Sequence, residues 1–169
     1  MKKYLFVLLA GMIVFTSCEK KSSVDNRDAF VGAYEYVTEG EMTRSTEESV
    51  EWNPTLPLES EGTIKISKVG EKDSVLVEGA FNGKIDPFKA VVEGSQLRVV
   101  KNEFSAKGQT FEVVLKVDNT IVPLVKDTLT WTSNNVQCEG TLMIPLIEKE
   151  LTITGQGHIT MKAHKIRLK

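Results

Sequence analysis

The two cysteines and two histidines of this sequence, Cys18, Cys138, His158 and His164, are its best candidates for nucleophilic, metal-binding or proton-transfer chemistry. The histidines lie six positions apart in a predicted strand, about 20 Å at 3.3 Å per residue, so one metal ion cannot bridge them. The sequence contains no Gly-x-Ser-x-Gly elbow, no His-Glu-x-x-His pair and no phosphate-binding glycine loop. It therefore predicts a protein that is not an enzyme and that uses no metal or cofactor.

Cys18 stands directly behind an apolar N-terminal segment. Lys2 and Lys3 are followed by the unbroken apolar run "YLFVLLAGMIVF", residues 4–15. That run is shorter than the roughly 20 residues that a membrane-spanning helix needs. A positive start followed by a short apolar run is typical of a secretory signal peptide, which we place at residues 1–17.

The four residues "FTSC", 15–18, resemble the lipobox of bacterial lipoproteins, in which two small residues precede a cysteine. The resemblance implies that Cys18 becomes the new N-terminus and carries acyl chains such as palmitate. Each buried methylene contributes about 0.8 kcal/mol to membrane binding, so several chains would hold a soluble domain at a bilayer. The expected location is the cell envelope, at the outer membrane, on a face that the sequence leaves open. The alternative is an ordinary signal peptide whose cleavage site contains a cysteine.

Residues 18–27 are polar and charged, and this composition predicts a flexible tether ahead of a single folded domain at 28–169. Removal of residues 1–17 takes away Lys2 and Lys3 and leaves 19 basic and 23 acidic residues, a net charge of −4. No basic stripe is present, so nucleic acid is not an expected partner. The expected partner is the lipid bilayer, reached through acylated Cys18, and protein partners are left open.

The rest of the chain has the alternating pattern of β-strands. In "EGTIKISKVGEKDSVLVEGAFNGKI", residues 61–85, apolar and polar residues alternate on both sides of a polar turn. Asn82-Gly83 predicts a two-residue hairpin. Further turns are expected at 70–74, 93–96, 117–120, 133–135, 147–150 and 155–160. Eight to ten strands with short turns indicate an all-β fold, an antiparallel up-and-down barrel or, alternatively, a β-sandwich.

Parity along two strands predicts which side chains face the core. Phe111, Val113, Leu115 and Val117 share one face, and the alternate residues of 136–146, Cys138 among them, share another. We therefore expect Cys138 to be a small buried hydrophobe rather than a reactive thiol. Trp131 is expected in the core for the same reason.

Residues 39–62 form the longest stretch without a strand pattern, and Pro54 and Pro57 exclude a central strand there. A connection of this length is often functional. Trp52, Leu56 and Leu58 supply its apolar groups. The stretch is either a surface loop that packs these groups against the domain or a lid over one end of a barrel.

"FVGAYEY", residues 30–36, resembles the first strand of lipocalin-like proteins, in which a Gly-x-aromatic element closes one end of the barrel. Gly32 and Tyr34 occupy that motif, with Tyr in place of the usual Trp. The order of strand, long loop and short-turn meander is similar to lipocalin-like lipoproteins of Gram-negative gut bacteria. The resemblance implies a small apolar ligand inside the barrel, with Tyr34, Trp52, Leu56 and Leu58 as candidate ligand-facing residues.

Three functions remain open at this point. The first is the binding of a small apolar ligand in the barrel. The second is a glycan- or protein-binding surface that uses exposed aromatic side chains such as Trp52 or Phe104. The third is a structural or inhibitory lipoprotein whose barrel is filled by its own side chains, since an eight-stranded barrel allows either a filled interior or one small ligand.

Overall fold

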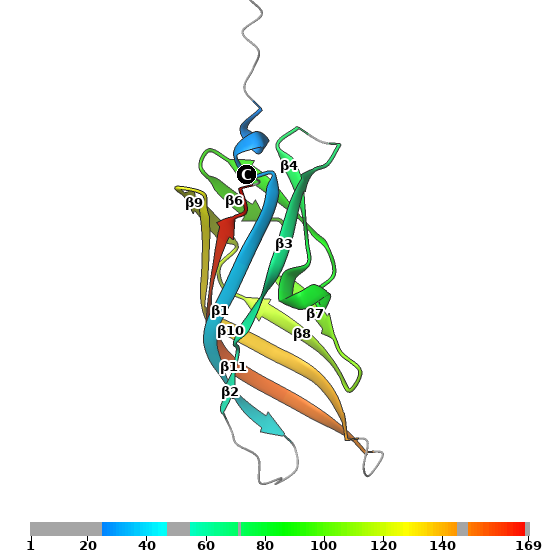
Figure 1. Ribbon diagram of the computed structural model, residues 1–169. Coiled ribbons are helices and arrows are strands. Elements are labelled where there is room, and N and C mark those ends of the chain that lie inside the picture. The colour runs from blue at the N-terminus through cyan, green and yellow to red at the C-terminus, as the bar shows by residue number, and fades with distance from the viewer. Residues whose placement is uncertain (1–24, 47–54, 71, 145–148, 168–169) are drawn as a thin grey trace, which may run out of the picture.

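The computed structural model describes residues 25–46, 55–70, 72–144 and 149–167. These residues form two short 3-10 helices and eleven strands (Figure 1). The elements are η1 (Asn26–Ala29), β1 (Gly32–Thr46), β2 (Thr55–Pro57), β3 (Ser60–Lys68), β4 (Ser74–Glu78), η2 (Ala80–Gly83), β5 (Phe88–Glu93), β6 (Gln96–Val99), β7 (Glu103–Lys107), β8 (Phe111–Val117), β9 (Ile121–Val125), β10 (Thr128–Ile144) and β11 (Lys149–Lys165).

Eight of the described strands close into an antiparallel barrel. Their order is β11-β1-β3-β4-β5-β6-β9-β10, and pairing of β10 with β11 completes the ring. The all-β barrel expected from the sequence is thereby confirmed, in preference to the sandwich. The fold is consistent with the lipocalin-like barrel that the first strand resembles.

Alternation of apolar and polar residues builds the barrel interior. Ile64 and Ile66 of β3 are buried, whereas their neighbours Thr63 and Lys65 are exposed. On β8, Val113 and Val117 are buried and Phe111 and Leu115 pack partly buried against the core, as the parity predicted. Burial of such apolar side chains is the main source of stability in a fold of this kind.

Three long strands continue past the barrel. Residues 40–46 of β1, 136–144 of β10 and 149–157 of β11 remain paired past the end of the barrel. There β8 pairs with β10, β7 pairs with β8, and β2 pairs with β1. We call this extension the arm: β2, β7 and β8 with residues 40–46, 136–144 and 149–157. Figure 1 shows it reaching away from the end that holds η1 and the C-terminus.

A belt of glycines and one bulge marks the passage from barrel to arm. Gly40 of β1 faces Ile159, and Gly157 of β11 pairs with Val136, next to a register shift between Ser133 and Val136 of β10. A Cβ at Gly40 would overlap the His158 carbonyl, and one at Gly157 would overlap the Glu41 carbonyl. Only glycine permits this close approach of strongly coiled strands.

Two turns that the sequence predicted at this belt are wrong. Residues 133–135 and 155–160 lie inside β10 and β11, where their Asn and Gly residues serve a bulge and a bend. Ser133 is fully buried, and its hydroxyl donates to Asp118 Oδ1 at 2.6 Å. That bond holds the bulge, and it lowers the pKa of the Asp118 carboxyl.

Two further predictions fail. The stretch 39–62 is not irregular throughout, because β1 runs to Thr46, β2 spans Thr55–Pro57 and β3 begins at Ser60. Asn82-Gly83 is not a two-residue hairpin either. It belongs to η2, within a nine-residue connection, 79–87, between the paired strands β4 and β5.

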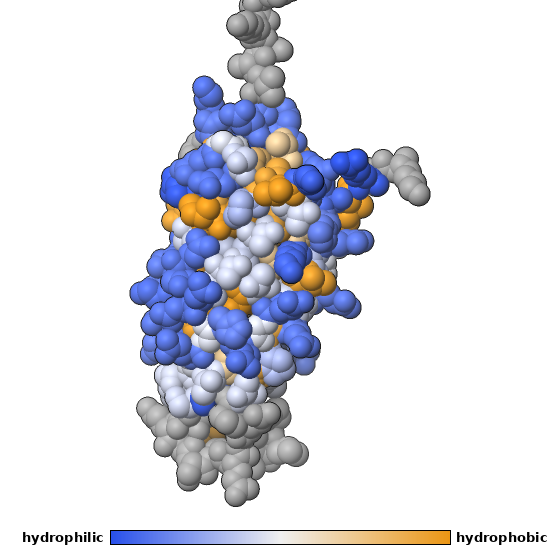
Figure 2. All heavy atoms as spheres, turned by 90° about the vertical axis from the view of Figure 1, so that its left-hand side faces the viewer, coloured by the Kyte–Doolittle hydropathy of each residue, from blue (hydrophilic) through white to orange (hydrophobic). Residues whose placement is uncertain are grey.

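The face turned toward the viewer in Figure 2 carries mainly polar and charged side chains. Its apolar patches are small and separated from one another (Figure 2). Isolated apolar groups of this kind are ordinary on a protein surface. This face therefore gives no sign of a large hydrophobic docking surface.

Candidate functional site

The barrel interior contains an apolar cavity of about 90 Å³. None of its lining side chains is charged. They come from every strand of the barrel except β1, from β7 and β8, and from the segments that precede β3, β5 and β9. They include Leu58, Ile66, Phe81, Phe88, Ala90, Leu97, Leu129, Trp131 and Met161. An apolar cavity of this kind stays dry, because a water inside it would find no hydrogen-bond partners.

The polar groups of Asn119 and Trp131 at the cavity wall form hydrogen bonds within the protein. Asn119 donates from Nδ2 to the Thr132 carbonyl at 2.8 Å, and its Oδ1 accepts from the Ile121 amide at 2.9 Å. Trp131 Nε1 donates to the Asn119 carbonyl at 2.8 Å. A ligand in the cavity would therefore meet hydrocarbon surface, and discrimination would rest on shape and polarity rather than on hydrogen bonds.

One end of the barrel is sealed around Tyr34. This ring is fully buried, and its hydroxyl donates to the Phe30 carbonyl at 2.7 Å. Lys165 Nζ lies 5.8 Å from the ring centroid and donates to the Ala29 carbonyl at 2.9 Å. Burial, with a smaller contribution from the charge of Asp127, raises the pKa of Tyr34 to about 12. We call this the closed end, and it is where the Gly-x-aromatic resemblance placed a closure.

β4 runs away from the closed end and leads into the connection 79–87, which we call the cap. Phe81 and Asn82 both have left-handed backbones, with φ of 51° and 56°. This region is uncommon for a bulky aromatic residue and stores strain of about 1 kcal/mol or more. Strained residues of this kind often occur at ligand clamps, and Phe81 lines the cavity.

Side chains of β1 and β3 hold the cap in this conformation. The Asn82 amide donates to Tyr36 Oη at 2.9 Å, and Tyr36 Oη lies 3.4 Å from Ser60 Oγ. Gly62 of β3 has no side chain, and a Cβ there would overlap Asn82 Oδ1. The cap thus closes over the barrel through a small set of polar contacts and one glycine.

The structure separates the residues that the sequence singled out as ligand-facing. Leu58 lines the cavity, whereas Leu56 lies on β2 of the arm and is 38% exposed. Tyr34 seals the closed end. Cys18 and Trp52 lie outside the described residues. The cap residues Phe81 and Phe88 were missed, although the left-handed preference of Asn82-Gly83 was a visible signal of an unusual backbone there.

Two predictions about single side chains have clear outcomes. The prediction that Phe104 offers an exposed aromatic face is wrong, because it is 8% exposed and packs edge-on against Phe88, with ring centroids 5.1 Å apart. The prediction that Cys138 is buried is confirmed. Burial raises the pKa of the Cys138 thiol, which disfavours the reactive thiolate. Trp131 is half-buried and packs against the core.

The arm carries a second concavity, a polar groove of about 960 Å³. One row of its residues crosses five strands in register, namely Thr43, Gln156, Gln137, Lys116 and Glu103. Lys116 Nζ and Glu103 Oε1 form an ion pair of 3.2 Å at the end of this row. The groove is open and hydrophilic, in contrast to the dry barrel interior.

No protein-family model matches the chain, and no curated protein matches it. Within the part of the chain that the structure describes, no helix has the length and apolar character to cross a bilayer. The features that bear on function are therefore the barrel, its cavity and its cap.

Proposed function

We propose that this chain is a lipid-anchored, non-enzymatic protein of the cell envelope that holds a small apolar molecule in its barrel. The observation that carries the proposal is the hydrocarbon-lined cavity of about 90 Å³ beneath a strained cap. The apolar segment 4–15 and the "FTSC" motif support the anchor, with Cys18 as the acylated residue. The outer membrane is the proposed location.

The cavity volume constrains the ligand. Pockets for drug-sized ligands measure roughly 300–1,000 Å³, whereas an engineered cavity of about 150 Å³ binds benzene. A space of 90 Å³ suits a molecule of a few carbon atoms. A larger ligand requires the half-buried rings of Phe81, Phe88 or Trp131 to move aside. The ligand is uncharged where it is buried, because no side chain in the lining could neutralise a charge.

A void also lowers stability, and this gives the proposal a direct test. At about 24 cal/mol per Å³, 90 Å³ of unfilled space costs about 2 kcal/mol relative to a filled core. A ligand that binds only the folded state restores part of this loss through mass action. Benzene enters once one of the rings of Phe81, Phe88 or Trp131 moves aside, and saturating benzene should then raise the free energy of unfolding of the wild-type domain.

The cavity-filling variant Ala90→Leu replaces a fully buried lining residue and should abolish the gain from benzene. Val99→Leu is a second filling variant in case the first packs poorly. Val114→Leu makes a comparable change on the exposed face of the arm and should respond to benzene as the wild type does. An equal response in all four proteins, or none in the wild type, would count against a ligand in the barrel.

The anchor has its own test. Intact mass of the protein extracted from membranes should show a chain that begins at Cys18 with added acyl mass. The Cys18→Ser variant should lose that mass and leave the membrane fraction. A chain that retains residues 1–17, or a Cys18 without acyl chains, would refute the anchoring half of the proposal.

A further inference from the structure

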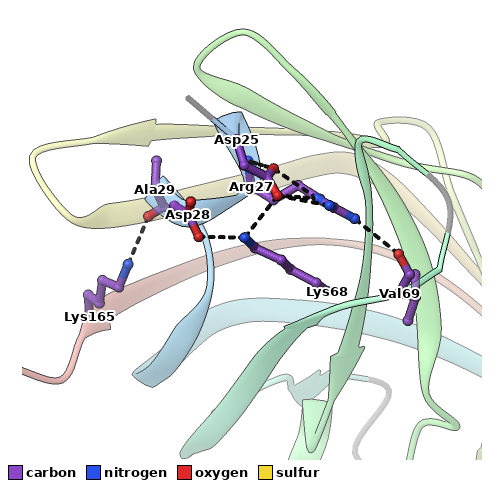
Figure 3. Close-up of polar contacts among 7 residues, drawn as sticks. All are labelled: Asp25, Arg27, Asp28, Ala29, Lys68, Val69 and Lys165. Atoms are coloured by element: carbon purple, nitrogen blue, oxygen red, sulfur yellow. Dashed lines mark hydrogen bonds and ion pairs between the residues drawn. The ribbon is translucent and has the colours of Figure 1, made fainter. Parts of the chain in front are cut away.

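The N-terminal segment is fastened to the closed end of the barrel by a group of charged side chains. We call this group the clasp, and it comprises Asp25, Arg27, Asp28, Lys68 and Lys165 (Figure 3). Lys68 Nζ, from the end of β3, lies 2.8 Å from Asp25 Oδ2 and 2.6 Å from Asp28 Oδ1. The clasp thus joins the last residues of the predicted tether, and Asp28 behind it, to β3 and β11 of the barrel.

Arg27 and Lys165 complete the clasp by reaching backbone carbonyls. Arg27 pairs with Asp25 at 2.8 Å and donates from Nη1 to the Val69 carbonyl at 3.0 Å, while Lys165 donates to the Ala29 carbonyl (Figure 3). The Asp25 carboxylate also accepts the Arg27 amide and so caps η1. Each anionic group is bound by at least one cation, and β3 and β11 both take part.

The clasp fixes how far the barrel can stand from the lipid. Asp25 lies seven positions after Cys18, and a chain spans at most about 3.5 Å per residue, which gives a reach of about 25 Å. The 17 residues of β11 run from the tip of the arm to the closed end, a path of about 50 Å. If the tip of the arm contacted the membrane, the chain between Cys18 and Asp25 would have to span about 50 Å, twice its reach of about 25 Å.

We propose that the clasp turns the closed end of the barrel toward the bilayer and presents the cap and the polar groove to the aqueous side. This inference rests on the proposed acylation of Cys18. It implies that the membrane-facing surface is the sealed end around Tyr34 and η1 and that a ligand reaches the cavity from solution or from a soluble carrier, not directly from the anchoring leaflet.

Release of the clasp would loosen this arrangement. The next firmly packed residue is Phe30, which is fully buried and lies twelve positions after Cys18. The reach then grows to about 42 Å, close to the length of the domain. The double variant Asp25→Asn/Lys68→Met removes the shared ion pairs and should therefore widen the range of orientations.

Energy transfer to labelled headgroups measures the orientation. The chain from Cys18 onward, with Cys138→Ala, is coupled through Cys18 to a maleimide lipid in phosphatidylcholine vesicles that carry acceptor headgroups. A donor dye is introduced through a non-canonical amino acid either at Ser95, in the β5–β6 turn at the closed end, or at Thr152, on the arm. Both positions are exposed.

The expected result is several-fold stronger transfer from Ser95 than from Thr152, with a smaller ratio in the clasp variant. Lys107→Met breaks a comparable ion pair, 2.8 Å to Glu112 on the arm, and should leave the ratio unchanged. Equal transfer from both positions, or stronger transfer from Thr152, overturns the orientation. An unchanged ratio in the clasp variant overturns the role of the clasp.

The two proposals fail separately in these experiments. The lipid is attached chemically, so the orientation can be measured whether or not cells acylate Cys18. Intact mass of the natural protein tests acylation, and energy transfer tests the geometry of the folded domain.

Discussion

The barrel and the arm share three strands, β1, β10 and β11, yet one region encloses an apolar cavity and the other carries an open groove. Above the belt, these strands belong to the closed barrel that contains the apolar cavity, whereas below it they support a groove with polar and charged side chains that crosses five strands. The difference arises at Gly40, Gly157 and the bulge at Ser133–Val136. Two glycines, together with one extra residue in β10 at the bulge, change a closed sheet into an extended one.

The comparison predicts that stability resides in the barrel. Leu129 is 1% exposed and lines the cavity, so Leu129→Ala enlarges an existing void and should lower the free energy of unfolding by about 3–4 kcal/mol. Leu56→Ala, the same change on the arm, should cost less than about 1 kcal/mol because Leu56 is largely in solvent. Urea unfolding of both variants measures the contrast. Similar losses at the two sites would break the distinction between the regions.

The belt itself should be the next most sensitive part of the molecule. Gly157→Ala places a Cβ against the Glu41 carbonyl and the Met42 Cα, and the forced separation of β1 and β11 should cost about 2–3 kcal/mol. Gly70→Ala is the matched control, since no atom lies within 4 Å of its Cβ position, and its effect should stay within about 0.5 kcal/mol. Thermal unfolding followed by circular dichroism distinguishes the two. A tolerant Gly157 would mean that the belt does not impose the bend.

A smaller effect is expected at the closed end. Tyr34→Phe removes one buried hydrogen bond and should cost about 1 kcal/mol at neutral pH. The folded protein holds the pKa of Tyr34 at about 12, above the unfolded value near 10, so this group stabilises the fold below pH 10 and that contribution disappears between about pH 10 and 12. Unfolding free energies of wild type and variant should converge over that interval. A constant difference between them would contradict the burial of the phenol.

The clasp should respond to acid instead of alkali. Hydrogen bonds from Arg27 and then Lys68 hold the pKa of the Asp25 carboxyl well below its usual range near 4. A depressed carboxyl pKa stabilises the fold above the unfolded value and loses this contribution as pH falls below it. Protease cleavage near residue 25 should therefore increase only below about pH 4. Cleavage that rises already at neutral pH would show that the clasp does not hold the segment.

Sequence patterning predicted the barrel because its strands bury one face. Alternation at Ile64, Ile66, Val113 and Val117 fixes both strand type and inward parity. It could not predict the length of β10 and β11. Asn134, Gly155 and Gly157 are residues of turns in most sequences. Only the close pairing with β1, more than 100 positions away, makes the two glycines residues of a bend, and Asn134 lies in the bulge of β10 opposite β11.

The candidate site was less accessible to sequence reasoning for a related reason. The sequence pattern assigns Leu58 to a long loop, whereas in the structure Leu58 lines the cavity together with Phe81 and Phe88. No pattern in the sequence groups these three residues. Their meeting depends on how β4 and β5 close over the barrel. Left-handed Phe81 in particular has no sequence signature, since an aromatic residue rarely adopts that backbone.

Native mass spectrometry of the chain from Cys18 onward, purified gently from the envelope, tests the ligand-binding claim most directly. The account predicts an added apolar mass, beyond any acyl chains, that disappears on extraction with organic solvent and is absent from Ala90→Leu. A wild-type chain that carries no such mass, and acquires none after incubation with benzene, indole or short-chain alcohols, would contradict a ligand-holding barrel and indicate that its core is filled by its own side chains.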